Sequence, residues 1–348
     1  MKNFLSILIA LLTFLACKDV KNKAEKAIEI KPDKSDFQHA FSVSYLDESA
    51  KNIIAPDAEV QELASGFDWT EGPVWVAEGA YLLFSDIPNN KVYKLNAQND
   101  TITYLNPSGC SYQNFKGKEP GSNGLLLNAK GELIIMQHGD RRISKMDAPL
   151  NNPKETYIPI AVAYKNQKLN SPNDAVFDTL GNLYFTDPPY GLPKGLHDEN
   201  KELSFQGVYC LLTTGEVVLL DKELKFPNGI GIAPDGKTLY LAVSNPEDAA
   251  WYAYDILDAG KVANKKLFYD ATHLVGKVGE QGLPDGLKVH SNGNLFATGP
   301  GGVWIFNPQG EVLARIKTGQ KTANCAFTDD EKKLFMTADN YILSIDLK

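Results

Sequence analysis

Short apolar runs, separated by turns rich in Gly, Asn and Asp, recur along most of the chain. In the stretch LPDGLKVHSNGNLFATG (283–299), an acid, Asp285, stands directly before a glycine and an apolar run, and a second glycine, Gly293, precedes another apolar run. This order predicts a strand, a tight glycine turn and a second strand. Weaker apolar runs follow, such as 302–316 after this unit and 207–220 after an earlier one, and they predict a third and a fourth strand.

Six copies of this unit recur every 39 to 57 residues. Their leading residues all carry a side-chain oxygen, and they are Glu71, Asn123, Asn173, Asn228, Asp285 and Asn324. In five copies a glycine follows eight residues later, and the sixth has Lys332 there. Repeats of this length built from short strands are typical of β-propellers. The sequence therefore predicts an all-β fold, a six-bladed β-propeller with four-stranded blades; a β-solenoid is the alternative, but its repeats would be shorter and more regular.

The last copy leaves room for about three strands before the sequence ends at YILSIDLK. The segment AEVQELASGF (58–67) has the apolar and polar pattern of a strand and precedes the first copy. We expect it to supply the fourth strand of the last blade and so to close the ring.

The amino-terminal segment differs from the rest of the chain. A short basic start and the apolar run FLSILIALLTFLA (4–16) precede Cys17, and this order resembles a bacterial lipoprotein signal. It predicts a lipoprotein-type signal peptide over 1–17 with lipid on Cys17, and a plain secretory signal is the alternative. Residues 18–57 are expected to form a polar tether and lead-in, and 58–348 the catalytic propeller domain. The protein is then an exported, membrane-anchored lipoprotein that faces the periplasm or the cell surface.

Composition excludes several classes of partner and site. The 348 residues carry a formal net charge of −8 and no basic run outside the amino-terminal segment, which argues against nucleic-acid binding. Cys110, Cys210 and Cys325 match no zinc-binding spacing and are expected to be buried thiols, with one disulfide possible. We expect a monomer or weak dimer that meets a membrane only through the lipid anchor.

Equivalent positions of successive blades form a ring around the channel of a propeller. The six leading residues should therefore direct their oxygens at one small volume. Glu71 and Asp285 would repel each other there, and one would take up a proton unless a cation lay between them. Oxygen ligands suit a hard cation such as Ca²⁺ or Mg²⁺. Asn and Asp also start turns for purely structural reasons, but that explanation does not account for Glu71.

Four segments carry a resemblance to a known family. The stretches EGPVW (71–75), LNSPNDAVFDTLGNLYFTDPPYG (169–191), FPNGIGIAPDGKTLY (226–240) and LPDGLKVHSNGNLFATGPGGVWIF (283–306) resemble the gluconolactonase/senescence-marker-protein (regucalcin) family, in particular its bacterial gluconolactonase branch. The resemblance runs from about residue 58 to the end. It implies a six-bladed propeller around a central metal-binding channel that holds one catalytic divalent cation, with Ca²⁺ as the first choice and Mg²⁺, Mn²⁺ or Zn²⁺ as alternatives.

The same resemblance assigns roles to individual residues. Glu71, Asn228 and Asp285 match metal ligands, Asn173 matches a fourth ligand or a substrate contact, and Asp285 also matches the residue that donates and accepts the proton. Ser171 and Pro172 stand where animal relatives carry an arginine, which leaves the preferred sugar open.

Further substrate contacts are expected around the ring. Asn123 is the leading residue of the second copy. His138 follows at the far end of its strand, where it is either a pocket residue or a hydrogen-bonded structural histidine. Asp187 and Tyr190 of TDPPYG lie at the channel mouth or, alternatively, in a rigid turn with a packed tyrosine.

The function expected from these residues is metal-dependent hydrolysis of a sugar lactone. The cation would polarise the carbonyl or activate a water, and Asp285 would act as general base and then as general acid. A phosphotriesterase-like hydrolase using the same site and a non-enzymatic, calcium-plugged binding propeller are the alternatives.

Overall fold

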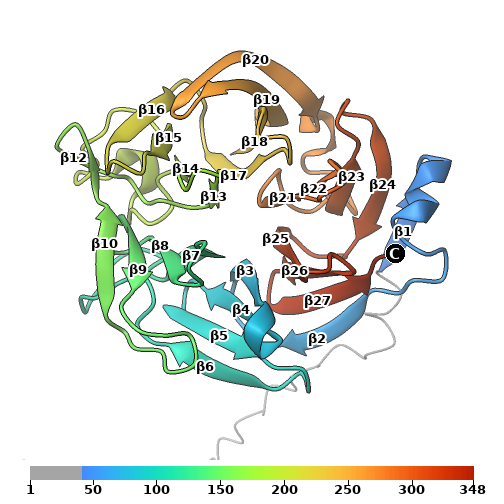
Figure 1. The fold of residues 1–348 in the computed structure, drawn as a ribbon, viewed down its shortest axis with the longest axis horizontal. Helices are drawn as coiled ribbons and strands as arrows, with labels where there is room; N and C mark the ends of the chain where they lie inside the picture. Colours follow the sequence, from blue (N-terminus) through green and yellow to red (C-terminus); the bar gives the residue numbers. More distant parts are fainter. Residues whose placement is uncertain (1–40) are drawn as a thin grey trace, which may run out of the picture.

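The computed structural model describes residues 41–348. Six sheets surround a central axis, as Figure 1 shows, and each contains at least four antiparallel strands. The fold is a six-bladed β-propeller, and the predicted fold class is confirmed. The signal peptide, the lipidation of Cys17 and most of the tether lie outside the described residues.

Each blade runs from an inner strand at the axis to an outer strand at the rim. Blades 1 and 2 contain β3 (Thr70–Val76), β4 (Tyr81–Asp86), β5 (Lys91–Leu95) and β6 (Thr101–Leu105), then β7 (Ser122–Leu127), β8 (Leu133–Gln137), β9 (Arg142–Met146) and β10 (Tyr157–Ala161). Blades 3 and 4 contain β13 (Ala175–Phe177), β14 (Leu183–Asp187), β15 (Gly207–Leu211) and β16 (Val217–Asp221), then β17 (Pro227–Ile232), β18 (Thr238–Asn245), β19 (Asp248–Asp258) and β20 (Lys261–Asp270). Blade 5 begins with β21 (Leu287–Val289), β22 (Leu295–Gly299), β23 (Gly302–Phe306) and β24 (Val312–Lys317), and blade 6 with β25 (Thr322–Phe327), β26 (Lys333–Ala338) and β27 (Tyr341–Asp346).

In blades 1 to 3 the second strand is the most thoroughly buried, because other strands of its own sheet flank it and the neighbouring sheets cover its faces. β4, β8 and β14 are buried at every position. The apolar clusters between blades are continuous: one joins Val76 and Leu83 of blade 1 to Leu125, Leu133 and other residues of blade 2. The apolar runs of the sequence therefore supply the side chains that pack between neighbouring sheets.

The ring is closed by strands from the two ends of the described chain. β2 (Gln61–Ser65) pairs antiparallel with β27, with Gln61 opposite Ser344 and Ser65 opposite Tyr341. β2 falls within the segment 58–67, so the prediction of a closing strand is confirmed.

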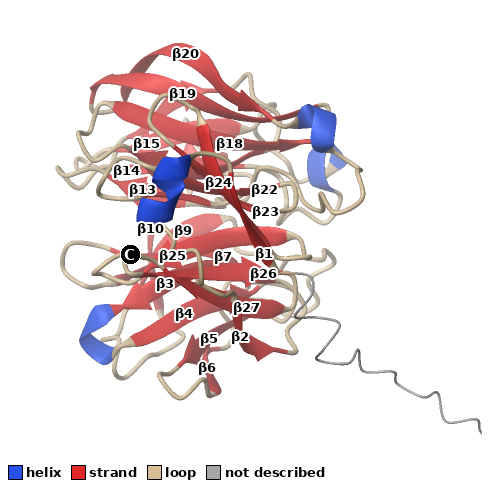
Figure 2. Ribbon diagram, turned by 90° about the vertical axis from the view of Figure 1, so that its right-hand side faces the viewer, coloured by secondary structure: helices blue, strands red, loops and turns tan. Residues whose placement is uncertain are grey.

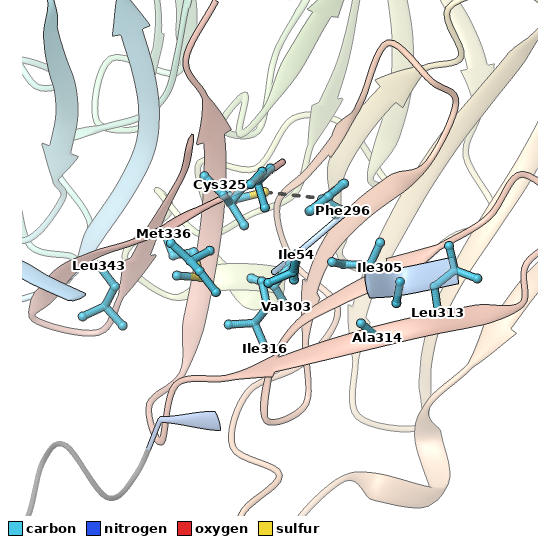
Figure 3. Close-up of a cluster of buried hydrophobic side chains, with 14 of the residues drawn as sticks. Ile54, Phe296, Val303, Ile305, Leu313, Ala314, Ile316, Cys325, Met336 and Leu343 are labelled. Atoms are coloured by element: carbon cyan, nitrogen blue, oxygen red, sulfur yellow. Dashed lines mark hydrogen bonds between the residues drawn. The ribbon is translucent and has the colours of Figure 1, made fainter. Parts of the chain in front are cut away.

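The segment before β2 also folds onto the propeller. β1 (Ser42–Tyr45) pairs with β24 and makes blade 5 five-stranded. A 3-10 helix, η1 (Glu48–Asn52), follows, and Ala50 and Ile54 are fully buried in the cluster between blades 5 and 6. Figure 3 shows Ile54 against Val303. The lead-in therefore contributes to the core of the domain.

Other helical elements are single turns: η2 (Ala77–Gly79), η3 (Gly195–His197) and η4 (Thr272–Leu274). Figure 2 shows these turns in the connections between strands. A two-stranded hairpin, β11 (Ala163–Tyr164) with β12 (Gln167–Lys168), leads into blade 3. In the part of the chain that the structure describes, no helix is long and apolar enough to cross a bilayer. Cys110, Cys210 and Cys325 are all buried free thiols.

Candidate active site in the central cavity

A cavity of about 450 Å³ opens at the axis, where the inner strands begin. Five of the six leading residues line it: Glu71, Asn123, Asn173, Asn228 and Asp285. Tyr190, Ser244 and Glu119 also line it, while Trp69, Ile87, Phe226, Val275 and Leu283 provide an apolar wall. The structure thus brings together residues that are more than 200 positions apart in the sequence.

Glycines allow the inner strands to approach closely at the ring. A glycine directly follows the leading residue in four copies, at positions 72, 124, 229 and 286. A Cβ atom added to Gly229 would lie 2.1 Å from the backbone oxygen of Asp285, and one added to Gly72 would lie 2.0 Å from that of Asn123. The missing side chain lets each leading residue of the next blade lie against the strand before it.

Side-chain hydroxyls on the second strands connect one blade to the next. They donate to backbone oxygens at or beside the next leading residue: Ser85 to Asn123 at 2.8 Å, Thr186 to Asn228 at 2.7 Å, Ser244 to Pro284 at 2.6 Å and Thr298 to Ala323 at 2.9 Å. All four hydroxyl residues lie near the end of the second strand of their blade. Sequence reasoning missed this set, although a Ser or Thr recurs at that place in five of the six copies.

The two acids of the ring have little access to solvent: Glu71 is buried, and Asp285 is half-buried with its Oδ1 inaccessible. Glu71 accepts a hydrogen bond from the Gly72 N–H at 3.0 Å. Burial raises the pKa of Glu71 to about 8, and the nearby carboxylates of Asp174 and Glu119 add to this, partly offset by hydrogen bonds. Burial and then the charge of Glu71 raise the pKa of Asp285 well above its ordinary value. Without a cation, ionisation of Glu71 therefore disfavours ionisation of Asp285.

The orientation of the Asn228 amide follows from its hydrogen bonds. Ser244 donates its single hydroxyl proton to the Pro284 carbonyl, so its oxygen must accept from Asn228 Nδ2, which lies 2.9 Å away. This arrangement turns the amide nitrogen towards Ser244 and leaves Oδ1 of Asn228 outside that bond. Two oxygens of cavity-lining residues are buried without any hydrogen-bond partner in the described structure: Oδ1 of Asn123 and Oδ1 of Asp285.

The donor set fits a hard divalent cation. The leading residues contribute two carboxylates and three amide side chains to the cavity, and Glu119 adds a third carboxylate. Two buried oxygens of the leading residues have no partner, and no histidine or cysteine of residues 41–348 lines the cavity. Within those residues, no group of three or more His, Cys, Asp or Glu side chains is arranged to hold a metal ion. A cation here would therefore depend on amide oxygens for part of its coordination.

Asn324, the sixth leading residue, belongs to a polar network beside the cavity. Its Nδ2 donates to Asp174 Oδ2 at 3.3 Å, and its Oδ1 accepts from the Cys325 N–H at 2.9 Å and from Lys288 Nζ at 3.3 Å. Lys288 also lies 3.8 Å from Asp174. Because Asn324 in turn hydrogen-bonds the Glu71 carboxylate, this network supports Glu71 from behind.

Among the expected substrate contacts, Tyr190 reaches the cavity and Asp187 does not. The Tyr190 ring stacks on Phe226, with 5.9 Å between centroids. Burial, and then the charge of Asp285, raise the pKa of the Tyr190 hydroxyl. The Asp187 carboxylate accepts from the backbone N–H groups of Asn170 and Ser171, both at 2.8 Å, and so holds the segment that leads to Asn173.

His138 is fully buried and does not line the cavity. Its Nδ1 lies 3.1 Å from Oε2 of Glu119, which does line it. Sequence reasoning missed Glu119, because this residue precedes the inner strand of blade 2 and falls outside the repeated unit.

Residues 69–340 match the family model described as the SMP-30/Gluconolactonase/LRE-like region. A gluconolactonase of Zymomonas mobilis is 35% identical over 300 residues, which cover 85% of this chain and 83% of that protein. A diisopropyl-fluorophosphatase of Loligo vulgaris is 28% identical over 179 residues, or 50% of this chain and 55% of that protein.

Solved structures agree with the fold. A gluconolactonase of Xanthomonas campestris superposes with a TM-score of 0.74 at 26% identity, covering 88% of this chain and 95% of that one. A calcium-binding protein of Agrobacterium tumefaciens, named regucalcin, superposes with a TM-score of 0.61 at 18% identity, covering 82% of this chain and 94% of that one, and this likeness concerns the fold alone.

Proposed function

Because the chain belongs to the SMP-30/gluconolactonase/LRE-like family, we propose that it is a metal-dependent hydrolase that opens a sugar lactone. One observation carries the proposal: buried Glu71 and half-buried Asp285, whose Oδ1 is inaccessible and unpartnered among the described residues, line one cavity together with amide side chains and an apolar wall. The gluconolactonase of Zymomonas mobilis, which matches over most of both chains, supports the lactone as substrate class.

Glu71, Asn173, Asn228 and Asp285 are the residues that would hold the cation. When bound, the cation would polarise the lactone carbonyl and stabilise the negative charge that develops on its oxygen. We propose Ca²⁺ first, with Mg²⁺, Mn²⁺ and Zn²⁺ as alternatives. The Ser244 hydroxyl fixes the Asn228 amide, and Asn324 hydrogen-bonds Glu71, so both ligands would be oriented before substrate arrives.

Asp285 would move the proton. A water oxygen attacks the lactone carbonyl carbon and gives up a proton to the Asp285 carboxylate. The bond between the carbonyl carbon and the ring oxygen then breaks, and Asp285 returns the proton to that oxygen. The product is the open hydroxy acid, and Asp285 is again ionised. Oδ1 of Asp285 lacks any hydrogen-bond partner in the described structure, which leaves it available for this exchange.

The apolar wall would position the substrate and limit water. Trp69, Phe226 and Leu283 offer apolar contact surface for the ring carbons of a lactone. Burial of the acids in this environment strengthens every charge interaction in the cavity.

The direct test is lactone hydrolysis by chelator-stripped protein, with Ca²⁺, Mg²⁺, Mn²⁺ and Zn²⁺ restored one at a time. We expect turnover of δ-gluconolactone to disappear on stripping and to return with at least one of these ions. Full turnover by metal-free protein would contradict the metal dependence, and absence of turnover with every ion would contradict the lactonase function.

A phosphotriesterase-like hydrolase is the second candidate, favoured by the match to the diisopropyl-fluorophosphatase of Loligo vulgaris over half of this chain. Assaying δ-gluconolactone and diisopropyl fluorophosphate with one preparation separates the two candidates. We expect the lactone to be the better substrate by kcat/KM.

A further inference from the structure

Glu119 differs from the ring residues in its position and in its surroundings. It lies in the segment before β7 and lines the same cavity, yet its side chain remains 32% exposed. His138 is the only ion-pair partner of its carboxylate among the described residues. Glu119 is thus a third acid on the cavity wall, outside the ring of leading residues.

His138 is held rigidly behind Glu119. The backbone N–H of His138 donates to the Gly121 carbonyl at 3.2 Å, and its backbone carbonyl accepts from the backbone N–H of Arg141 at 3.1 Å. A Cβ atom added to Gly191 would lie 2.7 Å from the Cβ atom of His138, so the TDPPYG turn packs directly on this residue. The backbone and the Cβ atom of His138 are therefore fixed on several sides.

The imidazole of His138 has no hydrogen bond that would explain its burial. It is fully buried, and neither ring nitrogen has a hydrogen-bond partner in the part of the chain that is described. Such burial is costly unless the group acquires a partner. Nδ1 lies 3.1 Å from Glu119 Oε2 without hydrogen-bond geometry, and a small rotation of the carboxylate would align the two groups.

Part of the cavity wall is apolar. The side chains of Trp69, Ile87 and Phe226 offer no acceptor to substrate hydroxyl groups. A carboxylate accepts strong, charge-assisted hydrogen bonds from hydroxyls. We infer that Glu119 binds the hydroxyl groups of the lactone substrate and that His138 is its positioning residue. This inference rests on the proposed lactonase function.

The test compares a polyhydroxylated lactone, δ-gluconolactone, with δ-valerolactone, which has no hydroxyl groups. For the metal-loaded full-length protein, Glu119→Gln should lower the ratio of kcat/KM values for the two lactones about tenfold, through the KM for δ-gluconolactone, because a charged acceptor is lost. Glu331→Gln is the matched control: Glu331 lies 3.3 Å from His290 Nδ1 but does not line the cavity, and we expect the ratio to stay unchanged.

His138→Gln should shift the same ratio in the same direction, and the double variant with Glu119→Gln should be no worse than Glu119→Gln alone. If Glu119→Gln lowers kcat equally for both lactones, or leaves the ratio unchanged, the hydroxyl-binding role is wrong. If the two substitutions add, the positioning role of His138 is wrong. A wild-type protein that hydrolyses neither lactone would overturn the proposed function itself.

Discussion

Asp86 and Asp187 occupy equivalent places at the ends of β4 and β14. Asp86 accepts from the Trp69 N–H at 3.2 Å, and Asp187 accepts from the backbone of Asn170 and Ser171. Each carboxylate thereby holds the segment that leads into the inner strand of its own blade. Asp187 of TDPPYG is one of the expected substrate contacts, but its hydrogen bonds hold the backbone around the site.

The pH dependence of stability should reveal the state of Asp187. Burial raises the pKa of Asp187 to about 7, whereas in the unfolded chain this carboxyl titrates near its ordinary value of about 4. The folded state therefore holds a proton that the unfolded state has lost, and its stability falls as the pH rises through this interval. We expect the stability advantage of wild type over Asp187→Asn to shrink by at least about 1 kcal/mol between pH 4 and pH 7, as measured by urea unfolding. An advantage that grows over this range would mean that Asp187 is ionised in the fold.

Replacement of Asp285 tests the proton transfer. Asp285→Asn keeps the shape and one oxygen of the side chain but cannot accept a proton. We expect kcat for δ-gluconolactone to fall about 10²- to 10⁴-fold, the usual contribution of a general base. Calorimetric titration with Ca²⁺ provides the control, since the variant must still bind a cation. Near wild-type turnover by the cation-loaded variant would contradict the role.

At the scale of elements, the site depends on contacts between inner strands of neighbouring blades. The glycine after a leading residue removes the steric barrier between two strands, and a hydroxyl from the second strand then bonds the backbone of the next blade. The oxygens of the ring are thus placed by the spacing of the blades together with the segments that lead into the inner strands.

Replacement of glycine by alanine should destabilise the fold more where two strands approach closely than in an open turn. At Gly229 an added Cβ would meet the Asp285 backbone, so Gly229→Ala should destabilise the fold by about 3 kcal/mol or more and disturb the site. Gly131 has a φ of +73° with open space around it, so Gly131→Ala should cost about 1–2 kcal/mol and leave lactone hydrolysis intact. Urea unfolding and turnover of both variants check this. Equal effects on stability and turnover would refute the close approach.

The sequence carries the strand and glycine periodicity directly, so the blades and the leading residues could be predicted from it. The bonds of Ser85 and Thr186 could not, because their partners are backbone carbonyls, which have no sequence signal. Glu119 lies outside the repeat and reaches the cavity only through the path of its loop. The placement of Asp187 and His138 depended on side-chain direction at a strand end, which periodicity does not determine.

At the scale of the whole molecule, the lead-in before β2 seals the junction of blades 5 and 6. Ala50 stands among polar residues and Ile54 in the short run Ile53-Ile54-Ala55, and neither belongs to the repeated unit, so their burial could not be predicted from the repeat. The last residue is tied to the same place, since the Lys348 N–H donates to the Ile53 carbonyl at 2.9 Å.

Truncation of Ile54 measures how much the lead-in contributes. Because Ile54 is fully buried, Ile54→Ala should lower the free energy of unfolding by about 2–5 kcal/mol. Leu46, in the same segment, is 60% exposed, so Leu46→Ala should change it by less than about 0.5 kcal/mol. Urea unfolding monitored by tryptophan fluorescence is the measurement. Similar small effects at both positions would show that the lead-in is dispensable for stability.

The pairing of β2 with β27 has a consequence for biosynthesis. The ribosome makes β2 before β3 and all later strands, and its partner β27 is the last strand of the ring to emerge. Until β27 emerges, the nascent chain therefore carries β2 as an unpaired strand, whose edge can pair with the edges of other chains. The ring can close only after β27 has emerged, so protection of this edge in the interval is a requirement that the circular architecture imposes on the cell.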